Sequence, residues 1–201
     1  MPDSGSFRNV LQDILKESIL ITKGRAFILF TSYSLLNIVY QQMLPFFEKE
    51  KIIALKQGSE NRHQLLAKFK KDKSSVLFGT DSFWEGVDVP GEALESVIIT
   101  KLPFKVPTEP IIEARVEAIQ RKGGNAFMEY SLPQAVLKLK QGVGRLIRNK
   151  TDIGSVLILD KRIVEKFYGK IFVTSLPNGQ LIKGPKDIVL NKLMTFLNNN
   201  R

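Results

Sequence analysis

Short apolar runs alternate along the chain with longer stretches in which apolar residues recur every three or four positions. The short runs are typical of buried strands, and the longer stretches are typical of helices that bury one face. The expected strands are residues 26–30, 52–55, 75–78, 97–100 and 155–159. The expected helices are residues 7–22, 34–50, 59–71, 108–122, 132–148, 161–168 and 185–198. This alternation predicts an α/β fold of three layers, with a mostly parallel central sheet flanked by helices.

The same alternation continues from one end of the chain to the other. Its 201 residues are enough for one sizeable core, and the sequence contains no linker, internal repeat or low-complexity tract. We therefore expect a single domain over residues 1–201, in which residues 1–23 form a leading helix and residues 180–201 contain a C-terminal helix. The buried stripe predicted for the leading helix is Val10, Leu11, Ile14, Leu15 and Ile19.

Charge and composition narrow the classes of function. The formal net charge of +10 favours a polyanionic partner. The chain has no cysteine, which excludes disulfides, thiolate metal sites and a cysteine-ligated iron–sulfur cluster within it. Its one histidine, His63, is predicted to be an exposed helix residue, so we expect no metal site. No apolar run is long enough to span a bilayer, and the first residues do not resemble a signal peptide, so we expect a cytoplasmic location and no membrane partner.

Polar and glycine-bearing segments directly follow three of the predicted strands. They are Thr31-Ser32-Tyr33, Gln57-Gly58 and Gly79-Thr80-Asp81-Ser82. Ligands of open parallel sheets bind at the carboxyl ends of the strands, so these segments are candidates for a binding site. The alternative is that each residue only caps a strand end or a turn.

The helix predicted at residues 132–148 has the most specific pattern in the chain. Gln141, Arg145 and Arg148 are spaced i, i+4 and i+7, so they share one face of a helix. The opposite, apolar stripe is Val136, Leu139, Val143, Leu146 and Ile147. Gly142 and Gly144 each cost about 1 kcal/mol in a helix, which favours a close approach of another group to the backbone. Guanidinium forks match phosphate oxygens, although a solvated basic helix face would have a similar pattern.

Several nucleotide-binding motifs are absent. The sequence contains no G-x-x-x-x-G-K-[ST] phosphate loop, no acidic pair at the end of an apolar strand and no G-x-G-x-x-G after the first strand. The chain thus has arginines suited to binding phosphate but no phosphate-binding loop. This combination predicts that it forms one half of a composite site. The other half is expected to come from another domain.

Together, these segments resemble the motifs of superfamily 2 helicases. Residues 141–148 resemble motif VI, residues 78–91 motif V, residues 30–33 motif IV, and Gln57-Gly58 the small motif between IV and V. Their order and spacing also match. Residues 84–88, Trp-Glu-Gly-Val-Asp, and residues 101–104, Lys-Leu-Pro-Phe, are similar to the DinG branch of the XPD-like group. The resemblance covers roughly residues 24–178.

The resemblance implies that the chain is the second RecA-like motor domain of an ATP-dependent DNA helicase of the DinG type. The first RecA-like domain of the same polypeptide would then bind most of the ATP and its Mg²⁺, and the isolated chain would be inactive. The cysteines of iron–sulfur members also lie in that first half. Some relatives carry a 3′→5′ exonuclease domain, so the alternative is an ATP-sensing regulatory domain that gates such a nuclease.

Roles for single residues follow from the same resemblance. Arg148 would be the arginine finger, Arg145 the ground-state contact to the γ-phosphate, and Gln141 the group that orients water or a neighbouring motif. The other nucleotide-side residues would be Gly86, which allows a sharp turn, Asp88, which accepts from a ribose hydroxyl, Glu85, which couples the two sites, and Gly144. The backbone of single-stranded DNA, or alternatively RNA, would be held by Thr31, Ser32, Gln57, Gly58 and Thr80.

Overall fold

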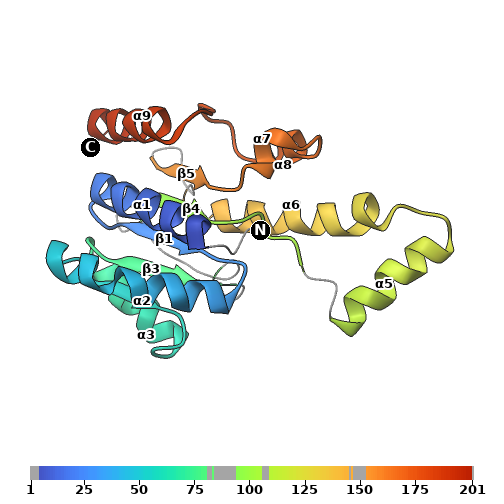
Figure 1. Ribbon diagram of the computed structural model, residues 1–201, viewed down its shortest axis with the longest axis horizontal. Coiled ribbons are helices and arrows are strands. Elements are labelled where there is room, and N and C mark those ends of the chain that lie inside the picture. Colours follow the sequence, from blue (N-terminus) through green and yellow to red (C-terminus); the bar gives the residue numbers. More distant parts are fainter. Residues whose placement is uncertain are drawn as a thin grey trace.

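Five short strands form one parallel sheet in the order β2-β3-β1-β4-β5 (Figure 1). The computed structural model describes residues 5–80, 83, 94–105, 109–144, 146 and 153–200. The strands are β1 (Ala26–Leu29), β2 (Ala54–Lys56), β3 (Val76–Gly79), β4 (Ser96–Ile99) and β5 (Ser155–Ile158). Every strand pair is parallel, which confirms the α/β fold with its central parallel sheet.

Helices cover both faces of this sheet and give the molecule its three layers. The helices of the described residues are α1 (Gly5–Thr22), α2 (Tyr33–Glu50), α3 (Arg62–Lys71), α5 (Pro110–Arg121), the π-helical turn η2 (Phe127–Ser131), α6 (Leu132–Val143), α7 (Arg162–Glu165), α8 (Gly169–Ser175) and α9 (Lys186–Asn199). Of these, α5 projects away from the sheet (Figure 1). Side chains alternate along β1, so that Phe27 and Leu29 face one core while Ala26 and Ile28 face the other. The first core also contains side chains of α3, α6 and α8, and the second contains those of α1, α2 and α9.

Some details of the predicted elements were wrong. Val10 was expected in the buried stripe of the leading helix, but its side chain is 57% exposed. The helix predicted at 132–148 ends at Val143 within the described residues, and Gly144 is its C-terminal cap. Lys138, a charged residue on α6, is buried. The π-helical turn before α6 and the division of residues 162–175 into α7 and α8 were not predicted.

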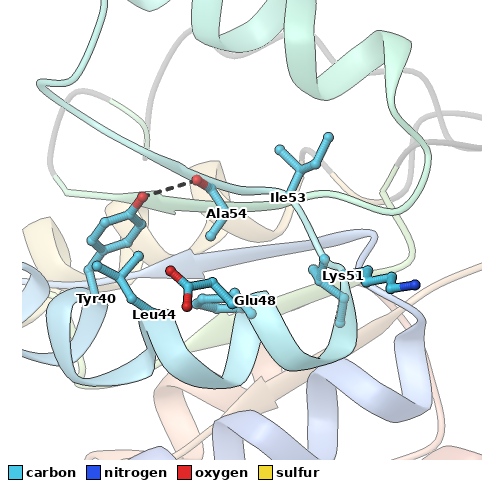
Figure 2. Close-up of a pocket in the computed structure, with 8 residues that line it drawn as sticks. Tyr40, Leu44, Glu48, Lys51, Ile53 and Ala54 are labelled. Atoms are coloured by element: carbon cyan, nitrogen blue, oxygen red, sulfur yellow. Dashed lines mark hydrogen bonds between the residues drawn. The ribbon is translucent and has the colours of Figure 1, made fainter.

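The outer edge of β2 is closed to further strand pairing. Ile53 and Gln57 bond to β3, so the carbonyl groups of Ala54 and Lys56 face outward. The Tyr40 hydroxyl donates to the Ala54 carbonyl oxygen at 3.1 Å (Figure 2), and the Ser59 hydroxyl donates to that of Lys56 at 2.8 Å. Exposed strand edges invite pairing with other chains, and these two side chains occupy the acceptors that such pairing would need.

A left-handed turn precedes β1. Lys23, Gly24 and Arg25 have φ values of 54°, 81° and 40°. The turn is fixed by the Gly24 amide, which donates to the Ile19 carbonyl at 3.0 Å, and by the Thr22 hydroxyl, which donates to the Gly24 carbonyl at 2.6 Å. A Cβ on Gly24 would lie 1.9 Å from the Ser74 carbonyl oxygen, so the turn requires glycine for steric as well as conformational reasons.

We expect Gly24→Ala to lower the free energy of unfolding by about 3 kcal/mol or more, because a left-handed backbone and a steric clash add together. Gly123→Ala is the matched control: Gly123 has a φ of 76°, but nothing lies within 4 Å of its added Cβ. The control should cost only about 1–2 kcal/mol. Urea unfolding of both variants measures the difference, and equal losses would contradict the steric argument.

Candidate functional site

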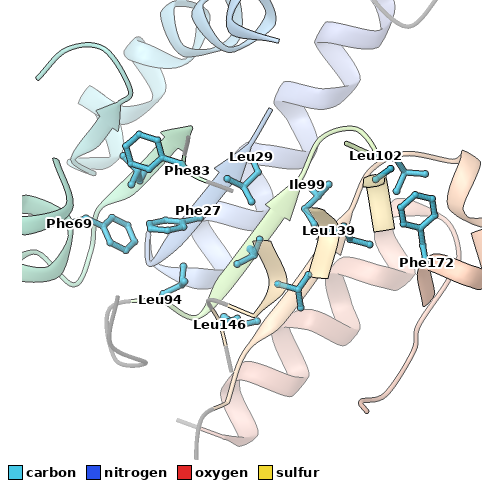
Figure 3. Close-up of a cluster of buried hydrophobic side chains, with 14 of the residues drawn as sticks. Phe27, Leu29, Phe69, Phe83, Leu94, Ile99, Leu102, Leu139, Leu146 and Phe172 are labelled. Atoms are coloured by element: carbon cyan, nitrogen blue, oxygen red, sulfur yellow. The ribbon is translucent and has the colours of Figure 1, made fainter. Parts of the chain in front are cut away.

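The sequence-predicted site residues that the structure describes fall into two groups at opposite ends of the sheet. A Cβ on Gly154, just before β5, would lie 2.5 Å from the Leu146 side chain, so the chain just after α6 lies at the amino end of β5. Figure 3 shows Leu146 beside Leu94, which precedes β4, whereas Leu102 lies beyond the opposite end of that strand. Gln141 and Gly144 therefore approach the amino edge of the sheet, and Thr31, Ser32, Gln57, Gly58 and Thr80 lie at its carboxyl edge.

The amino-edge group is described only in part. Gln141 is half-buried on the last turn of α6, and its side chain has no hydrogen-bond partner among the described residues. Gly144 is exposed, and its φ of −61° and ψ of −4° do not require glycine. Its added Cβ would lie 3.1 Å from the Lys140 carbonyl oxygen and would meet no described side chain within 4 Å. Arg145, Arg148, Glu85, Gly86 and Asp88 lie outside the described residues.

At the carboxyl edge, the structure brings the ends of β2 and β3 together through their polar residues. The Gln57 amide oxygen accepts hydrogen bonds from the Thr80 backbone N–H at 2.6 Å and from the Thr80 hydroxyl at 3.0 Å. The Tyr33 hydroxyl donates to the Gln57 carbonyl at 2.9 Å. Gly58 follows with a φ of 90°, and a Cβ there would lie 2.1 Å from the Tyr33 hydroxyl. These contacts fix the row of strand ends as one surface.

The polar groups of this row are not equally available to a ligand. Ser32 is the N-cap of α2, and its hydroxyl oxygen accepts from the Leu35 amide at 3.3 Å. Thr80 is buried and bonded to Gln57. Within the described part of the chain, the Thr31 hydroxyl and the Gln57 side-chain nitrogen have no hydrogen-bond partner. The Ser32 hydroxyl accepts in the cap but keeps its own O–H donor, so Thr31, Ser32 and Gln57 are the side chains in the row with donors available to a ligand.

An ion pair at the end of β5 was not predicted. Asp160 is 8% exposed, and its carboxylate accepts from the Leu102 amide at 2.9 Å and from the Arg162 amide at 3.0 Å. The Arg162 guanidinium donates to the same carboxylate at 2.6 Å and lies 5.3 Å from the centre of the Phe104 ring. The sequence does contain a signal for this pair, since Asp160-Lys161-Arg162 directly follows an apolar strand. A carboxylate buried at a strand end requires a charged or amide partner, and Arg162 is close enough in the sequence to provide one.

Burial and hydrogen bonding act in opposite directions on Asp160. Burial alone would raise the pKa of its carboxyl group. The hydrogen bonds from Arg162 and from the Leu102 amide, together with the positive charge of Arg162, outweigh burial and leave the pKa of Asp160 below its usual value. Asp160 is thus a charged acceptor at neutral pH.

Because the pKa of Asp160 is lowered on folding, the carboxylate stabilises the fold at pH values above its unfolded pKa of about 3.9. This contribution is lost as the pH falls through the lower folded pKa. Asp160→Asn should therefore lower the free energy of unfolding at pH 7, and its difference from the wild type should shrink from pH 4 downward. Urea unfolding across this pH range measures the effect, and an equal difference at pH 7 and pH 3 would contradict a charge-based role.

The hollows of the surface do not coincide with either group. An open depression of about 370 Å³ lies between α2 and β2 and is lined by Tyr40, Leu44, Phe47, Glu48, Lys51, Ile52, Ile53 and Ala54 (Figure 2). None of the predicted site residues lines it. Over the described ranges, no helix is long and apolar enough to cross a bilayer, and no three acidic or histidine side chains gather as metal ligands.

A parallel sheet covered on both faces, with polar segments at its strand ends, defines a RecA-like α/β domain. Residues 15–179 match the helicase C-terminal domain family, and the chain belongs to that family. The resemblance stated from motifs IV, V and VI is thus confirmed.

Relatives of known name agree with this assignment. The chain is 47% identical over 191 residues to the ATP-dependent DNA helicase YoaA of Haemophilus influenzae, and the match covers 95% of this chain and 29% of that protein. It is 39% identical over 172 residues to the 3′-5′ exonuclease DinG of Bacillus subtilis, with 83% of this chain and 18% of that protein covered. The chain therefore spans less than a third of the length of either relative.

Solved structures support the fold. The structure named XPD_APO superposes with a TM-score of 0.66 at 20% identity, over 90% of this chain and 37% of that chain. At this identity the likeness shows a shared fold, and the fold is that of the XPD-like helicases.

Proposed function

We propose that the chain is the second motor domain of an ATP-dependent DNA helicase of the DinG type, where it supplies the arginine finger and part of the groove for single-stranded DNA. The observation that carries the proposal is that Gln141 and Gly144 lie toward one end of the sheet, whereas Thr31, Ser32, Gln57, Gly58 and Thr80 lie at the other. A motor domain needs such a division, because one end must respond to nucleotide while the other holds the strand. The relatives named as ATP-dependent DNA helicases support the same proposal.

The amino edge is proposed to face ATP. Arg145 and Arg148 follow α6 in the sequence, and Gly144, the C-terminal cap of that helix, is exposed without a conformational need for glycine, which fits the close approach of a phosphate group. Phosphoryl transfer depends mainly on charge stabilisation, and an arginine finger contributes about 10³–10⁵ in rate in other systems. Gln141 would orient water, and Glu85, Gly86 and Asp88 would approach the nucleotide from motif V.

ATP and Mg²⁺ would be held mainly by the first RecA-like domain of the same polypeptide. The described part of the chain has no carboxylate cluster for Mg²⁺, and the whole sequence has no phosphate loop. The half-buried Gln141 and the exposed Gly144 fit a nucleotide that another domain already holds. This division of labour leaves the isolated chain without an ATPase site of its own.

The carboxyl edge is proposed to hold single-stranded DNA, or RNA, through its backbone. The Thr31 hydroxyl and the Gln57 side-chain nitrogen can donate to phosphate or sugar oxygens, and Gly58 would contribute its main-chain N–H. Ser32 and Thr80 would shape the edge through their internal hydrogen bonds. Contacts of this kind fix the position of a strand without reading its sequence.

ATP binding would close the two domains and hydrolysis would reopen them, so that alternate grips on the strand give stepping. The second candidate function is regulation of an attached nuclease by the same closure. The Bacillus subtilis relative, which is named a 3′-5′ exonuclease, favours it, and the chain covers a smaller share of that protein than of the Haemophilus influenzae helicase.

In the full-length protein, Arg148→Ala should lower ATP turnover by about 10²-fold or more, while nucleotide affinity changes little. The contact of a finger strengthens in the transition state, so its loss reduces kcat rather than binding. Arg148→Lys should restore only part of the rate, because an ammonium group lacks the guanidinium fork. Steady-state turnover and nucleotide titration measure both effects.

Lys140→Ala is the matched control for Arg148→Ala. Lys140 is exposed near the end of α6, and its substitution by alanine also removes one positive charge. Lys138 is unsuitable since it is buried. Equal losses of turnover in the Lys140 and Arg148 variants would identify a diffuse basic surface and not a finger.

Thr31→Val in the full-length protein should weaken binding of single-stranded DNA by about 2- to 10-fold, which corresponds to one hydrogen bond of roughly 0.5–1.5 kcal/mol. Affinity should fall with rising salt for both proteins, and the salt slope should be the same because Thr31 is uncharged. Fluorescence anisotropy with a labelled oligonucleotide measures both quantities.

Ser32→Ala tests the alternative, purely structural role at the neighbouring position. Loss of an N-cap should lower the free energy of unfolding by about 1 kcal/mol. If Thr31→Val instead lowers stability and leaves DNA affinity unchanged, Thr31 only caps a strand end.

A further inference from the structure

The chain that leaves β4, residues 100–104, is fastened at several points although it belongs to no helix or strand. The Thr100 amide and hydroxyl both donate to the Leu29 carbonyl oxygen, at 3.1 Å and 3.0 Å. The Leu102 amide donates to Asp160 at 2.9 Å. Lys101 stands between these two anchors, so its backbone is held on both sides.

Aromatic contacts hold the last residue of the segment. The Phe104 ring stacks on Phe127 of η2 at 5.7 Å, with 24° between the planes. It also meets Tyr168 and Phe172 edge-on, each at 5.6 Å. Arg162 covers Phe104 from a further direction, with its guanidinium 5.3 Å from the ring centre. Residues 100–104, called the β4 exit below, are thus joined to η2 and to the region of α7 and α8.

The β4 exit extends the row of strand ends proposed to hold DNA. In the sheet, β4 is the neighbour of β1 on the side away from β3. Leu29, whose carbonyl accepts from Thr100, lies two residues before Thr31. A strand that passes the ends of β2, β3 and β1 would next meet residues 100–104.

The geometry of Arg162 suits a supporting role. Its guanidinium edge is occupied by the Asp160 carboxylate, and its flat face covers Phe104. Arginine can form both contacts at once because its fork and its planar face are separate surfaces, which lysine lacks. Its charge is already paired with a buried carboxylate, although the side chain is 39% exposed.

We infer that Asp160 and Arg162 form a positioning pair that sets residues 100–104 for binding of single-stranded DNA. The inference rests on the proposed function, and it adds the β4 exit to the DNA groove. The pair acts through Leu102 and Phe104 and does not itself contact the strand. If Arg162 contacted DNA directly, removal of the Asp160 carboxylate would strengthen DNA binding. If the pair positions residues 100–104, the same change would weaken DNA binding.

The test is Asp160→Asn in the full-length protein. Removal of a negative charge near a polyanion strengthens binding by electrostatics alone, and it would free Arg162 for a phosphate. Loss of the positioning pair instead weakens binding of an oligo-dT strand by about 5- to 30-fold, as expected for one or two hydrogen bonds at about 1 kcal/mol each. The DNA concentration for half-maximal ATP turnover should rise by the same factor, while turnover at saturating DNA changes by less than about twofold.

Glu165→Gln is the matched control, because it removes one negative charge from the same segment at an exposed position paired only loosely with Lys161 at 3.6 Å. It should leave DNA affinity unchanged or slightly raised. Arg162→Lys retains the charge but not the fork and the stacked face, so it should weaken binding in the same direction as Asp160→Asn. It also provides the test should Asp160→Asn not fold.

Tighter or unchanged DNA binding by Asp160→Asn, with weaker binding by Arg162→Gln, would identify Arg162 as a phosphate contact and overturn the inference. A loss of stability is expected for Asp160→Asn in either case, but a loss of turnover at saturating DNA as large as the loss of DNA affinity would also overturn the inference, in favour of a purely structural pair. Failure of the wild-type protein to bind the strand would overturn the proposed function itself, and the positioning role with it.

Discussion

Burial of both faces of the sheet is the constraint on which the rest of this structure depends. Helices α1, α2 and α9 cover one face, while α3, α6 and α8 cover the other, so every residue of the central strands β1, β3 and β4 is buried. Polar groups that are to meet a ligand must therefore lie where strands begin or end. The chain follows this rule at both edges: α6 ends near the amino edge, and hydroxyl, amide and glycine residues follow β1, β2 and β3 at the carboxyl edge. Two separate surfaces on one rigid sheet are a direct consequence.

Much of this arrangement could be predicted from the sequence, because its signals are local. The strands β1, β3 and β4 are buried at every position, and short continuous apolar runs of this kind can be recognised as strands in the sequence. His63 is exposed on α3 as predicted. Thr31, Ser32, Gln57, Gly58 and Thr80 do gather at one edge, since parallel strands bring their carboxyl ends together. The roles proposed for these residues rest on the family resemblance and stay predictions.

The parts that could not be predicted depend on packing between distant segments. Val10 fits the helical period of the buried stripe of α1, but no neighbouring element covers its side chain among the described residues. The charge of Lys138 predicts an exposed side chain, yet Lys138 is buried at its position on α6. Asp160 and Leu102 are 58 residues apart, and no periodicity connects a carboxylate after one strand with an amide after its neighbour. Patterns of single elements show which face is apolar, whereas such contacts arise only when the elements are assembled.

The closed outer edge of β2 has a consequence for how the longer protein can move. Tyr40 and Ser59 occupy the outward carbonyl groups of Ala54 and Lys56, so a strand from elsewhere in the polypeptide cannot continue the sheet on this side through those acceptors. A neighbouring domain must therefore meet this flank through side chains. Side-chain contacts between domains can rearrange at a small cost in free energy, whereas a continuous ladder of backbone hydrogen bonds would join the two domains rigidly. Two hydroxyl groups thus act against a continuous sheet between this flank of the domain and a neighbouring body.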